Sequence, residues 1–474
     1  MPQHAPPPMP TGSDPGRRAL LGSNLRPRGR WLRGAVAGMA ALSLGGFAAG
    51  CGDDDSDSAS STAAQTTASS ASGGKLSFTP SPGTDIPKVS VKFAMWPYGD
   101  TTIAVPGIEQ GWFKEVGIDL PNGKETRTIK QVQQQLLNGQ LDIGSGYVPN
   151  TIQTYGTAPE LKMVQLQNSY IGNYIWSNPK NNATSYTELK DQGKNFDEAS
   201  KAVIEQMKGK RVALSDAGSN REFFNTLLKM GGLTTKDFSS FDVVSDTKIV
   251  QLAKAGKIDY AFPAGAAQSV EVQDLGFENL FGFNDMVEGL PKGDPRVLNG
   301  VGHAGIQATD KYVENNRETV LRFMGVFYRI IDDLQNKPDE ILKYSLPTLS
   351  TATGTDLTLD QAVALFKDFY GTANFKQAKD LMENPDYPLY YDMVYSSQIK
   401  AAQEGGILKD KDVTPDDMIV MKGLYQDLVA LKEGYEKIKE EKAPTGELAD
   451  KAATFYETYD YLDAYRLIKA ASEQ

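Results

Sequence analysis

Two stretches of the sequence share one pattern: Leu137-Asn138-Gly139-Gln140-Leu141-Asp142-Ile143, and Leu252-Ala253-Lys254-Ala255-Gly256-Lys257-Ile258-Asp259-Tyr260. In each, a leucine and a glycine precede an apolar residue, an aspartate and a second apolar residue. Residues 129–138 place their apolar side chains on one helical face, and a glycine commonly ends a helix. Each stretch therefore predicts a helix that feeds a strand. One such unit in each half indicates two similar α/β lobes with a cleft between them.

The alternation of strands and helices continues on both sides of these stretches. Strands are expected at 89–95, 117–120, 141–144, 162–166, 174–176, 211–214 and 258–262. A helix is expected from Ile103 to Val116, and the pattern is nearly all helical after about residue 305. This alternation predicts α/β layers with mostly parallel sheets. Open α/β sheets bind ligands at the carboxyl ends of their strands, so the loops after these strands should face the cleft.

Composition excludes several classes of protein. The 474 residues contain one cysteine, Cys51, which excludes a disulfide framework, a thiolate zinc site and a cysteine-ligated iron–sulfur cluster. The only histidines are His4 and His303, so a multi-histidine metal site is excluded, and a catalytic triad would depend on His303 alone. The net charge of −11 argues against a nucleic-acid partner. We therefore expect no enzyme activity, cofactor or metal.

The N-terminal region has the features of an export signal. Residues 1–33 carry six arginines, and the short, Gly-rich apolar stretch 34–50 ends in small residues before Cys51. This resembles a bacterial lipoprotein signal, in which Cys51 is acylated and becomes the mature N-terminus. An uncleaved signal anchor is the alternative, and the export route (general or twin-arginine) stays open. Residues 51–74 are rich in Ser, Thr, Ala and Asp and predict a flexible linker, so the protein should be lipid-anchored on the outer face of the cell membrane.

A family resemblance is carried by three motifs in order. They are Gly111-Trp112-Phe113-Lys114-Glu115-Val116-Gly117-Ile118, residues 137–143, and Met207-Lys208-Gly209-Lys210-Arg211-Val212-Ala213 followed by Gly218-Ser219. From about Lys88 to about Ile419 the chain resembles the periplasmic solute-binding proteins of the sulfonate, nitrate and thiamine-precursor type. The resemblance implies a type II periplasmic-binding-protein fold, whose two lobes close over a small solute and dock on the permease of an ABC importer. Related enzymes of thiamine-pyrimidine synthesis rely on a cysteine-rich stretch that this chain lacks.

The resemblance also implies a domain division. Residues 75–170 and 299–420 would form a discontinuous first lobe, and residues 171–298 the second. The hinge segments would lie near 169–177 and 298–306. Residues 421–474 would add a helical C-terminal extension to a monomeric protein.

Candidate ligand-binding residues lie in the loops after strands. Gly218, Ser219 and Asn220 can open a helix whose N–H groups face an anion, with Arg221 in its first turn. The alternative is that Ser219 only caps the helix and Arg221 faces solvent.

Other candidates lie after the remaining strands. Trp96 and Tyr98 would give an aromatic wall, and Ser145 and Tyr147 a polar turn. Asn168 and Ala264 complete the set. The aromatic residues favour an organic, partly flat solute, anionic or aromatic, such as a sulfonate, a carboxylate or a pyrimidine. His303 is expected to be a hydrogen-bonded structural residue.

A second function remains open, that of a lipid-anchored sensory or adaptor protein using the same cleft to contact a membrane partner. Its support is the long tail, in which Tyr425, Leu428, Leu431, Tyr435 and Ile438 form an apolar helical stripe. Packing of this stripe against the protein's own lobe is the other use. A surface hydrolase is disfavoured because no nucleophile–histidine pair can be assembled.

Overall fold

The computed structural model describes residues 76–96, 98–216 and 218–474. The predicted signal at 1–50, the linker at 51–74 and the acylation site Cys51 lie outside these residues. Within the described part, no helix combines the length and apolar character needed to cross a membrane.

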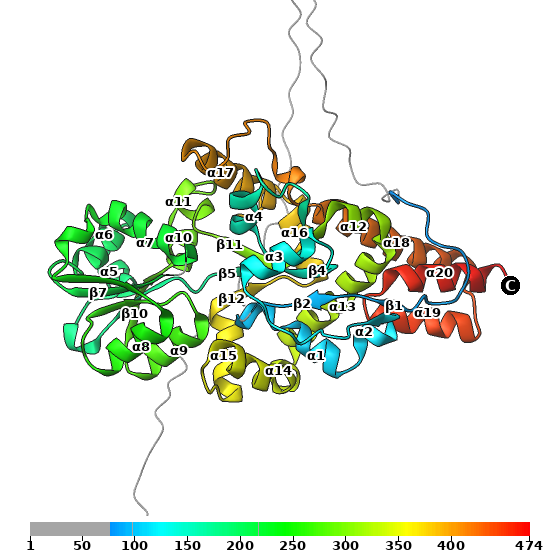
Figure 1. The fold of residues 1–474 in the computed structure, drawn as a ribbon, viewed down its shortest axis with the longest axis horizontal. Coiled ribbons are helices and arrows are strands. Elements are labelled where there is room, and N and C mark those ends of the chain that lie inside the picture. The colour runs from blue at the N-terminus through cyan, green and yellow to red at the C-terminus, as the bar shows by residue number, and fades with distance from the viewer. Residues whose placement is uncertain (1–75, 97, 217) are drawn as a thin grey trace, which may run out of the picture. The chain divides into compact units, whose positions relative to one another are not determined.

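Two five-stranded sheets form the centres of two lobes (Figure 1). The first sheet has the order β12 (Tyr370–Thr372), β5 (Leu161–Tyr170), β11 (Gly302–Thr309), β4 (Ile143–Tyr147) and β2 (Phe93–Ala94). The second has the order β10 (Glu278–Gly282), β6 (Tyr174–Ser177), β9 (Tyr260–Phe262), β7 (Arg211–Ser215) and β8 (Ser240–Val244). A separate parallel pair joins β1 (Val89–Ser90) to β3 (Ile118–Asp119). We call each five-stranded sheet with its helices the first and second lobe. The two-lobed α/β architecture confirms the predicted fold class.

The sheets are more mixed than predicted. In the second sheet β7 pairs in parallel with both β8 and β9, as expected. In the first sheet only β2 and β4 pair in parallel, and the other three pairings are antiparallel. Two of these arise because β11 returns from the second lobe and inserts between β4 and β5, running against both. The third arises because the short strand β12 runs against β5.

Helices cover both sheets. Those of the first lobe are α1 (Ala104–Glu109), α2 (Trp112–Glu115), α3 (Ile129–Leu137), α4 (Val148–Thr154), α12 (Asp310–Asn315), α13 (Arg317–Asn336), α14 (Pro338–Thr353), α15 (Leu359–Phe369), α16 (Phe375–Glu383) and α17 (Tyr391–Glu404). Those of the second lobe are α5 (Tyr186–Asp191), α6 (Phe196–Glu205), α7 (Gly218–Gly231), α8 (Asp246–Lys254), α9 (Ala266–Asp274), α10 (Phe283–Gly289) and α11 (Pro295–Leu298). The single helix predicted over 103–116 is wrong: it is divided into α1 and α2, because Gly111 takes a left-handed backbone with φ of 76°.

The repeated sequence pattern has the same structural role in both lobes. Gly139 and Gly256 follow α3 and α8 with φ of 73° and 64°, which turns the chain out of each helix. The aspartate then exchanges two hydrogen bonds with a residue at the start of a neighbouring strand: Lys92 directly before β2, or Arg211, the first residue of β7. The N–H of Lys92 donates to the Asp142 carboxylate at 2.8 Å, and the N–H of Asp142 donates to the Lys92 carbonyl at 2.9 Å.

The second lobe repeats this exchange between Arg211 and Asp259, with both distances 2.9 Å. The Arg211 guanidinium adds two further bonds to the same carboxylate, at 3.0 and 2.7 Å. The aspartates therefore anchor the start of a strand in each sheet.

In the described part of the chain, two segments connect the lobes. Residues 171–173 join β5 to β6, and residues 299–301 join α11 to β11. Both leave the first lobe from one place, because Tyr170 at the end of β5 lies opposite Gly302 at the start of β11. The two connections are thus adjacent, as a hinge requires.

The C-terminal residues form α18 (Met421–Lys442), α19 (Glu447–Glu457) and α20 (Tyr461–Ser472), which pack on the first lobe. The apolar stripe predicted in this tail lies on α18. Four of its residues are buried and Ile438 is partly buried against the same core. The stripe therefore packs against the protein's own first lobe, including β5 and α16.

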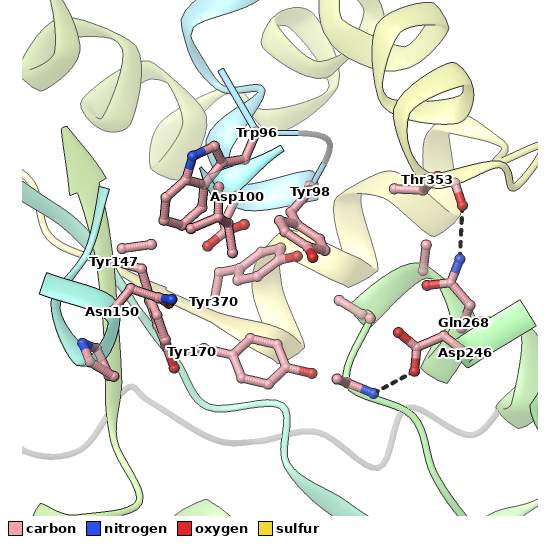
Figure 2. Close-up of a pocket in the computed structure, with 18 of the residues that line it drawn as sticks. Trp96, Tyr98, Asp100, Tyr147, Asn150, Tyr170, Asp246, Gln268, Thr353 and Tyr370 are labelled. Atoms are coloured by element: carbon pink, nitrogen blue, oxygen red, sulfur yellow. Dashed lines mark hydrogen bonds between the residues drawn. The ribbon is translucent and has the colours of Figure 1, made fainter. Parts of the chain in front are cut away.

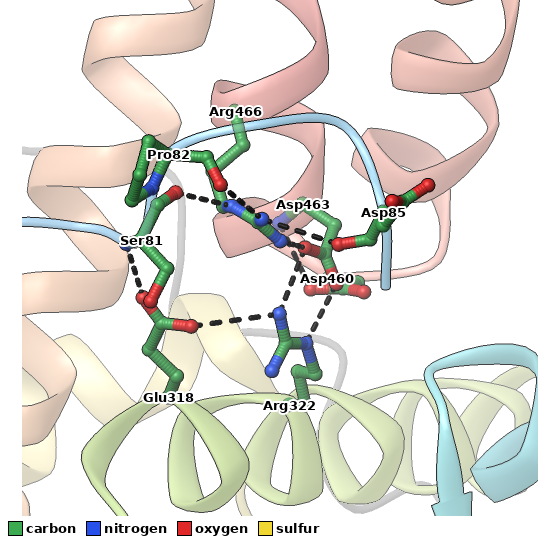
Figure 3. A network of polar contacts seen from close by, with 8 residues as sticks. All are labelled: Ser81, Pro82, Asp85, Glu318, Arg322, Asp460, Asp463 and Arg466. Carbon is green, nitrogen blue, oxygen red and sulfur yellow. Dashed lines mark hydrogen bonds and ion pairs between the residues drawn. The ribbon is translucent and has the colours of Figure 1, made fainter. Parts of the chain in front are cut away.

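A buried ionic network joins α20 to α13 and to the N-terminal segment (Figure 3). Arg322 of α13 donates to both carboxylate oxygens of Asp463 at 2.7 and 3.0 Å. Arg466 pairs with Asp463 at 2.5 Å and donates to the carbonyl of Ser81 at 2.8 Å. Burial and the nearby Asp463 raise the pKa of Asp460 well above its ordinary value.

Candidate functional site

A cavity of about 560 Å³ lies between the two lobes, and side chains from both lobes line it (Figure 2). This volume is typical of sites for small organic ligands. The lining combines aromatic rings, carboxylates and a few amides.

Five aromatic side chains form one side of the cavity, which we call the aromatic wall. They are Trp96, Tyr98, Tyr147, Tyr170 and Tyr370. Three of them follow or end β2, β4 and β5, which run in one direction, so the carboxyl ends of these strands place them at one edge of the sheet. Tyr370 joins them because it pairs with Tyr170 across β12 and β5, with ring centroids 5.9 Å apart.

Buried groups behind the wall position its members. The Ser145 hydroxyl, 2% exposed, accepts a hydrogen bond from the Trp96 backbone N–H at 3.2 Å. A Cβ atom at Gly302 would lie 1.9 Å from the Tyr147 hydroxyl oxygen, so only glycine at that position leaves room for this ring. Burial raises the pKa of Tyr170 and Tyr370 well above the ordinary value, and both rings therefore stay uncharged.

The second lobe contributes carboxylates from the ends of its parallel strands. Asp216 directly follows β7, Asp246 begins α8 two residues after the end of β8, and Glu222 lies on α7. Asp246 accepts a hydrogen bond from the backbone N–H of Ala264 at 2.9 Å, and the N–H of Gly265 also donates to it. Figure 2 shows Asp246 and Gln268 across the cavity from the aromatic wall.

The charges of both lobes converge on the cavity. The first lobe adds Asp100, which brings the lining carboxylates to four: Asp100, Asp216, Glu222 and Asp246. Burial raises the pKa of Tyr98, and the carboxylates of Asp246, Asp100 and Asp216 raise it further. Burial also raises the pKa of Asp246, against the hydrogen bonds that it accepts. Among the described residues of the lining there is no Lys, Arg or His.

The structure brings some of the predicted site residues together. Trp96, Tyr98, Tyr147 and Ala264 all line the cavity. Ser145 and Asn168 are buried within β4 and β5, behind the lining.

The predicted cluster on α7 is placed differently. Asn220 is 1% exposed, and its side-chain amide donates to the Phe262 carbonyl at 2.8 Å, which ties α7 to β9. Arg221 is exposed and is not among the lining residues. The backbone of Gly218 and Ser219 begins α7, and the Ser219 side chain lies outside the described part of the structure.

Sequence reasoning gave Tyr170 only as a weaker candidate near the crossing between the lobes, and it missed Tyr370 and the four carboxylates. The rule that ligands bind at the ends of strands could have found Asp216 and Asp100. Tyr370 gave no such signal, because β12 is three residues long and lies in a region with a helical pattern.

His303 is buried in β11 and packs against Tyr395, with ring centroids 5.5 Å apart. Among the described residues neither ring nitrogen has a hydrogen-bond partner, so the predicted hydrogen-bonded histidine is wrong. Burial lowers its pKa from 6.5 to about 3, which keeps the imidazole neutral.

Comparison with known proteins identifies the family. No curated protein matches the chain in sequence. A family model described as NMT1/THI5 like matches residues 100–341, slightly more than half of the chain. The chain belongs to the NMT1/THI5-like family. This NMT1/THI5-like region ends within α14, so β12 and the C-terminal helices lie beyond it.

Several solved structures are similar to this NMT1/THI5-like protein. The periplasmic aliphatic sulphonate-binding protein SsuA from Escherichia coli is 12% identical, covering 70% of this chain and 91% of that chain at a TM-score of 0.45. The periplasmic sulfonate-binding protein SsuA from Methylobacillus flagellatus is 16% identical, covering 76% and 98% at 0.49. The periplasmic nitrate-binding protein NrtA from Synechocystis is 12% identical, covering 73% and 89% at 0.46.

Proposed function

We propose that this protein is an exported, lipid-anchored solute-binding component of an ABC importer, without enzyme activity. It captures a small organic solute between its lobes and delivers it to the permease. The observation that carries the proposal is the cavity, whose lining is divided between two lobes connected by two adjacent segments. The similar structures are named as sulphonate-binding and nitrate-binding proteins, and small-solute binding is the function that we propose for this chain.

The geometry supports capture by closure. The aromatic wall belongs to the first lobe and Asp216, Glu222 and Asp246 belong to the second. A solute that contacts both sides is bound more tightly when the lobes approach, so binding shifts the population toward the closed form. The closed form then differs in shape from the empty one, which gives a permease a surface to recognise.

The test is a binding and closure experiment on the purified protein. Sulfonates, aromatic carboxylates, aminopyrimidines, nitrate and organic amines would be screened by thermal shift and by small-angle X-ray scattering. A solute at a hundredfold its Kd should stabilise the protein by about 2.7 kcal/mol, a shift of a few degrees. It should also reduce the radius of gyration.

A pair of variants locates the binding. Tyr370→Ala removes a ring of the aromatic wall and should abolish the thermal shift. Tyr344→Ala, on α14 and away from the lining, should retain it. Failure of every class to stabilise or compact the protein would refute the solute-binding proposal.

The lipid anchor is tested separately in cells. Labelled palmitate should enter the wild-type protein, and Cys51→Ala should abolish labelling and move the protein from the membrane to the soluble fraction. Equal membrane association of both proteins would refute acylation at Cys51.

The adaptor alternative loses its main support in this structure. The apolar stripe that would have contacted a partner is buried against the first lobe. No feature of the described residues favours an adaptor over a solute receptor.

A further inference from the structure

We infer that the solute is an organic cation, held between the ring faces of the aromatic wall and the carboxylates of the second lobe. The inference rests on the proposed function and names its substrate class. The sequence suggested an anionic or aromatic solute, and the inference departs from the anionic one.

The first step is the sign of the charge. Carboxylates enter the cavity from both lobes, and the described lining contains no basic side chain to balance them. Within the described part of the chain, Asp216, Glu222 and Asp246 form no ion pair with a Lys or Arg. Because the walls of a cleft concentrate the field of such charges, the cavity attracts cations and repels anions.

The second step concerns the N–H groups that an anion would need. Anions in α/β proteins are commonly held by the N–H groups at a helix N-terminus. Here the N–H groups of Ala264 and Gly265, directly before α9, already donate to the Asp246 carboxylate. The protein's own anion therefore occupies the N-terminus of α9, and a sulfonate or carboxylate would have to displace Asp246 to bind there.

The third step is the chemistry of the opposite wall. The faces of Trp and Tyr rings carry negative charge density and attract ammonium groups placed over them. Tyr170 and Tyr370 lie next to one another at the cavity, and Tyr98 and Trp96 extend the same wall. Rings on one side and carboxylates on the other suit a cation with an apolar body, because each part of it meets a complementary surface.

The test compares probes of one shape and different charge. Benzyltrimethylammonium, its carbon isostere neopentylbenzene and benzenesulfonate form one series. Tyramine and its alcohol analogue tyrosol form the second. Titration calorimetry on the full protein should show each cation binding at least tenfold more tightly than its neutral isostere, and benzenesulfonate not binding. Raising the ionic strength from about 0.05 M to about 0.5 M should weaken only the cations.

Isosteric variants assign the charge. Asp246→Asn keeps the shape and an acceptor for Ala264, and should weaken cation binding at least tenfold. Asp216→Asn gives an independent test should the first variant fold poorly. Asp242→Asn, an exposed acid of β8 in the same lobe, is the matched control and should leave binding unchanged.

The outcomes separate this inference from the proposed function. The cation inference is overturned if neutral or anionic probes bind as tightly as the cations. It is also overturned if Asp246→Asn and Asp216→Asn both bind the cations as the wild type does. Either result leaves a solute-binding protein for another class of solute. Absence of binding across these series and the wider screen refutes the receptor itself, and the cation inference falls with it.

Discussion

At the scale of single residues, His303 links burial to acid sensitivity. Its pKa is lowered from 6.5 to about 3 by burial, so the folded protein holds it neutral while the unfolded chain binds a proton below about pH 6.5. Stability from this residue is therefore fully present above pH 6.5 and is lost as the pH falls toward 3. Between pH 7 and pH 5 the loss should be roughly 2 kcal/mol.

His303→Phe tests this expectation. Phenylalanine fills a similar volume against Tyr395 and removes the titrating group. Urea unfolding at pH 7 and pH 5 should show a smaller loss for the variant than for wild type. Equal losses in the two proteins would show that this histidine does not titrate as its burial requires.

At the scale of elements, α13 and α20 are joined by a buried ion pair. Arg322 and Asp463 are 2% and 0% exposed, and the guanidinium meets the carboxylate with two hydrogen bonds. Removing one partner of a buried pair leaves an uncompensated charge in the interior. Asp463→Ala should therefore lower the free energy of unfolding by about 3–5 kcal/mol, as measured by urea denaturation.

Two further variants make the comparison specific. Glu404→Ala removes one partner of the exposed Lys400–Glu404 pair and should change stability by no more than about 0.5 kcal/mol. Replacing both partners, as Arg322→Met with Asp463→Leu, should recover only part of the loss, because Arg466 also loses the Asp463 carboxylate. A cost for Asp463→Ala no larger than that for Glu404→Ala would contradict the structural role of the pair.

The C-terminal helices show that the sequence predicts a helix and its apolar face but not the element against which that face packs. Helical periodicity predicted an apolar stripe on α18, and the stripe is there. The surface that it covers could not be predicted, because β5 and α16 are distant in sequence. Since α18 packs on β5, deletion of residues 421–474 should destabilise the first lobe, which urea denaturation would show as a lower free energy of unfolding.

At the scale of the whole molecule, the lobes also touch through α9 and the α14–α15 region. The Gln268 amide donates to the Thr353 carbonyl at 2.9 Å, and the Thr355 hydroxyl donates to Glu271 at 2.9 Å. The Gln361 amide donates to Asp274 at 2.7 Å. These contacts form a latch that favours approach of the lobes.

Thr355→Val combined with Gln361→Ala replaces no residue of the cavity lining and removes three bonds of the latch. They are the Thr355–Glu271 bond, the bond that the Gln268 amide donates to the Thr355 hydroxyl, and the Gln361–Asp274 bond. At about 1 kcal/mol for each bond, the approached state should lose roughly 3 kcal/mol. Scattering should show a larger radius of gyration for the ligand-free protein, and Kd should rise by at least about tenfold. Gln403→Ala, which removes a bond within the first lobe, is the control. An unchanged radius in the double variant would exclude a latch.

The two lobes and the aromatic loop after the first strand could be predicted from hydrophobic periodicity and from the order of the strands. The complete lining of the cavity could not be predicted, because Tyr170 and Tyr370 meet only through the pairing of β5 with β12. Asp246 is an ordinary residue for the start of a helix in sequence terms, and its position in the cleft comes from the arrangement of the second sheet. Local pattern therefore gave the elements, whereas the charge of the cavity required their assembly.

The hydrogen bonds that hold residues 77–85 to the C-terminal helices have a mechanical consequence. Before the chain enters β1, Ser77 is bonded through its N–H and hydroxyl to Asp427 of α18, and the carbonyls of Ser81 and Asp85 accept from Arg466 of α20. A pull on the chain from its N-terminal side would load these bonds before it reached β2 and Trp96. The C-terminal helices would therefore carry such a force, and the two lobes would stay free to move relative to each other.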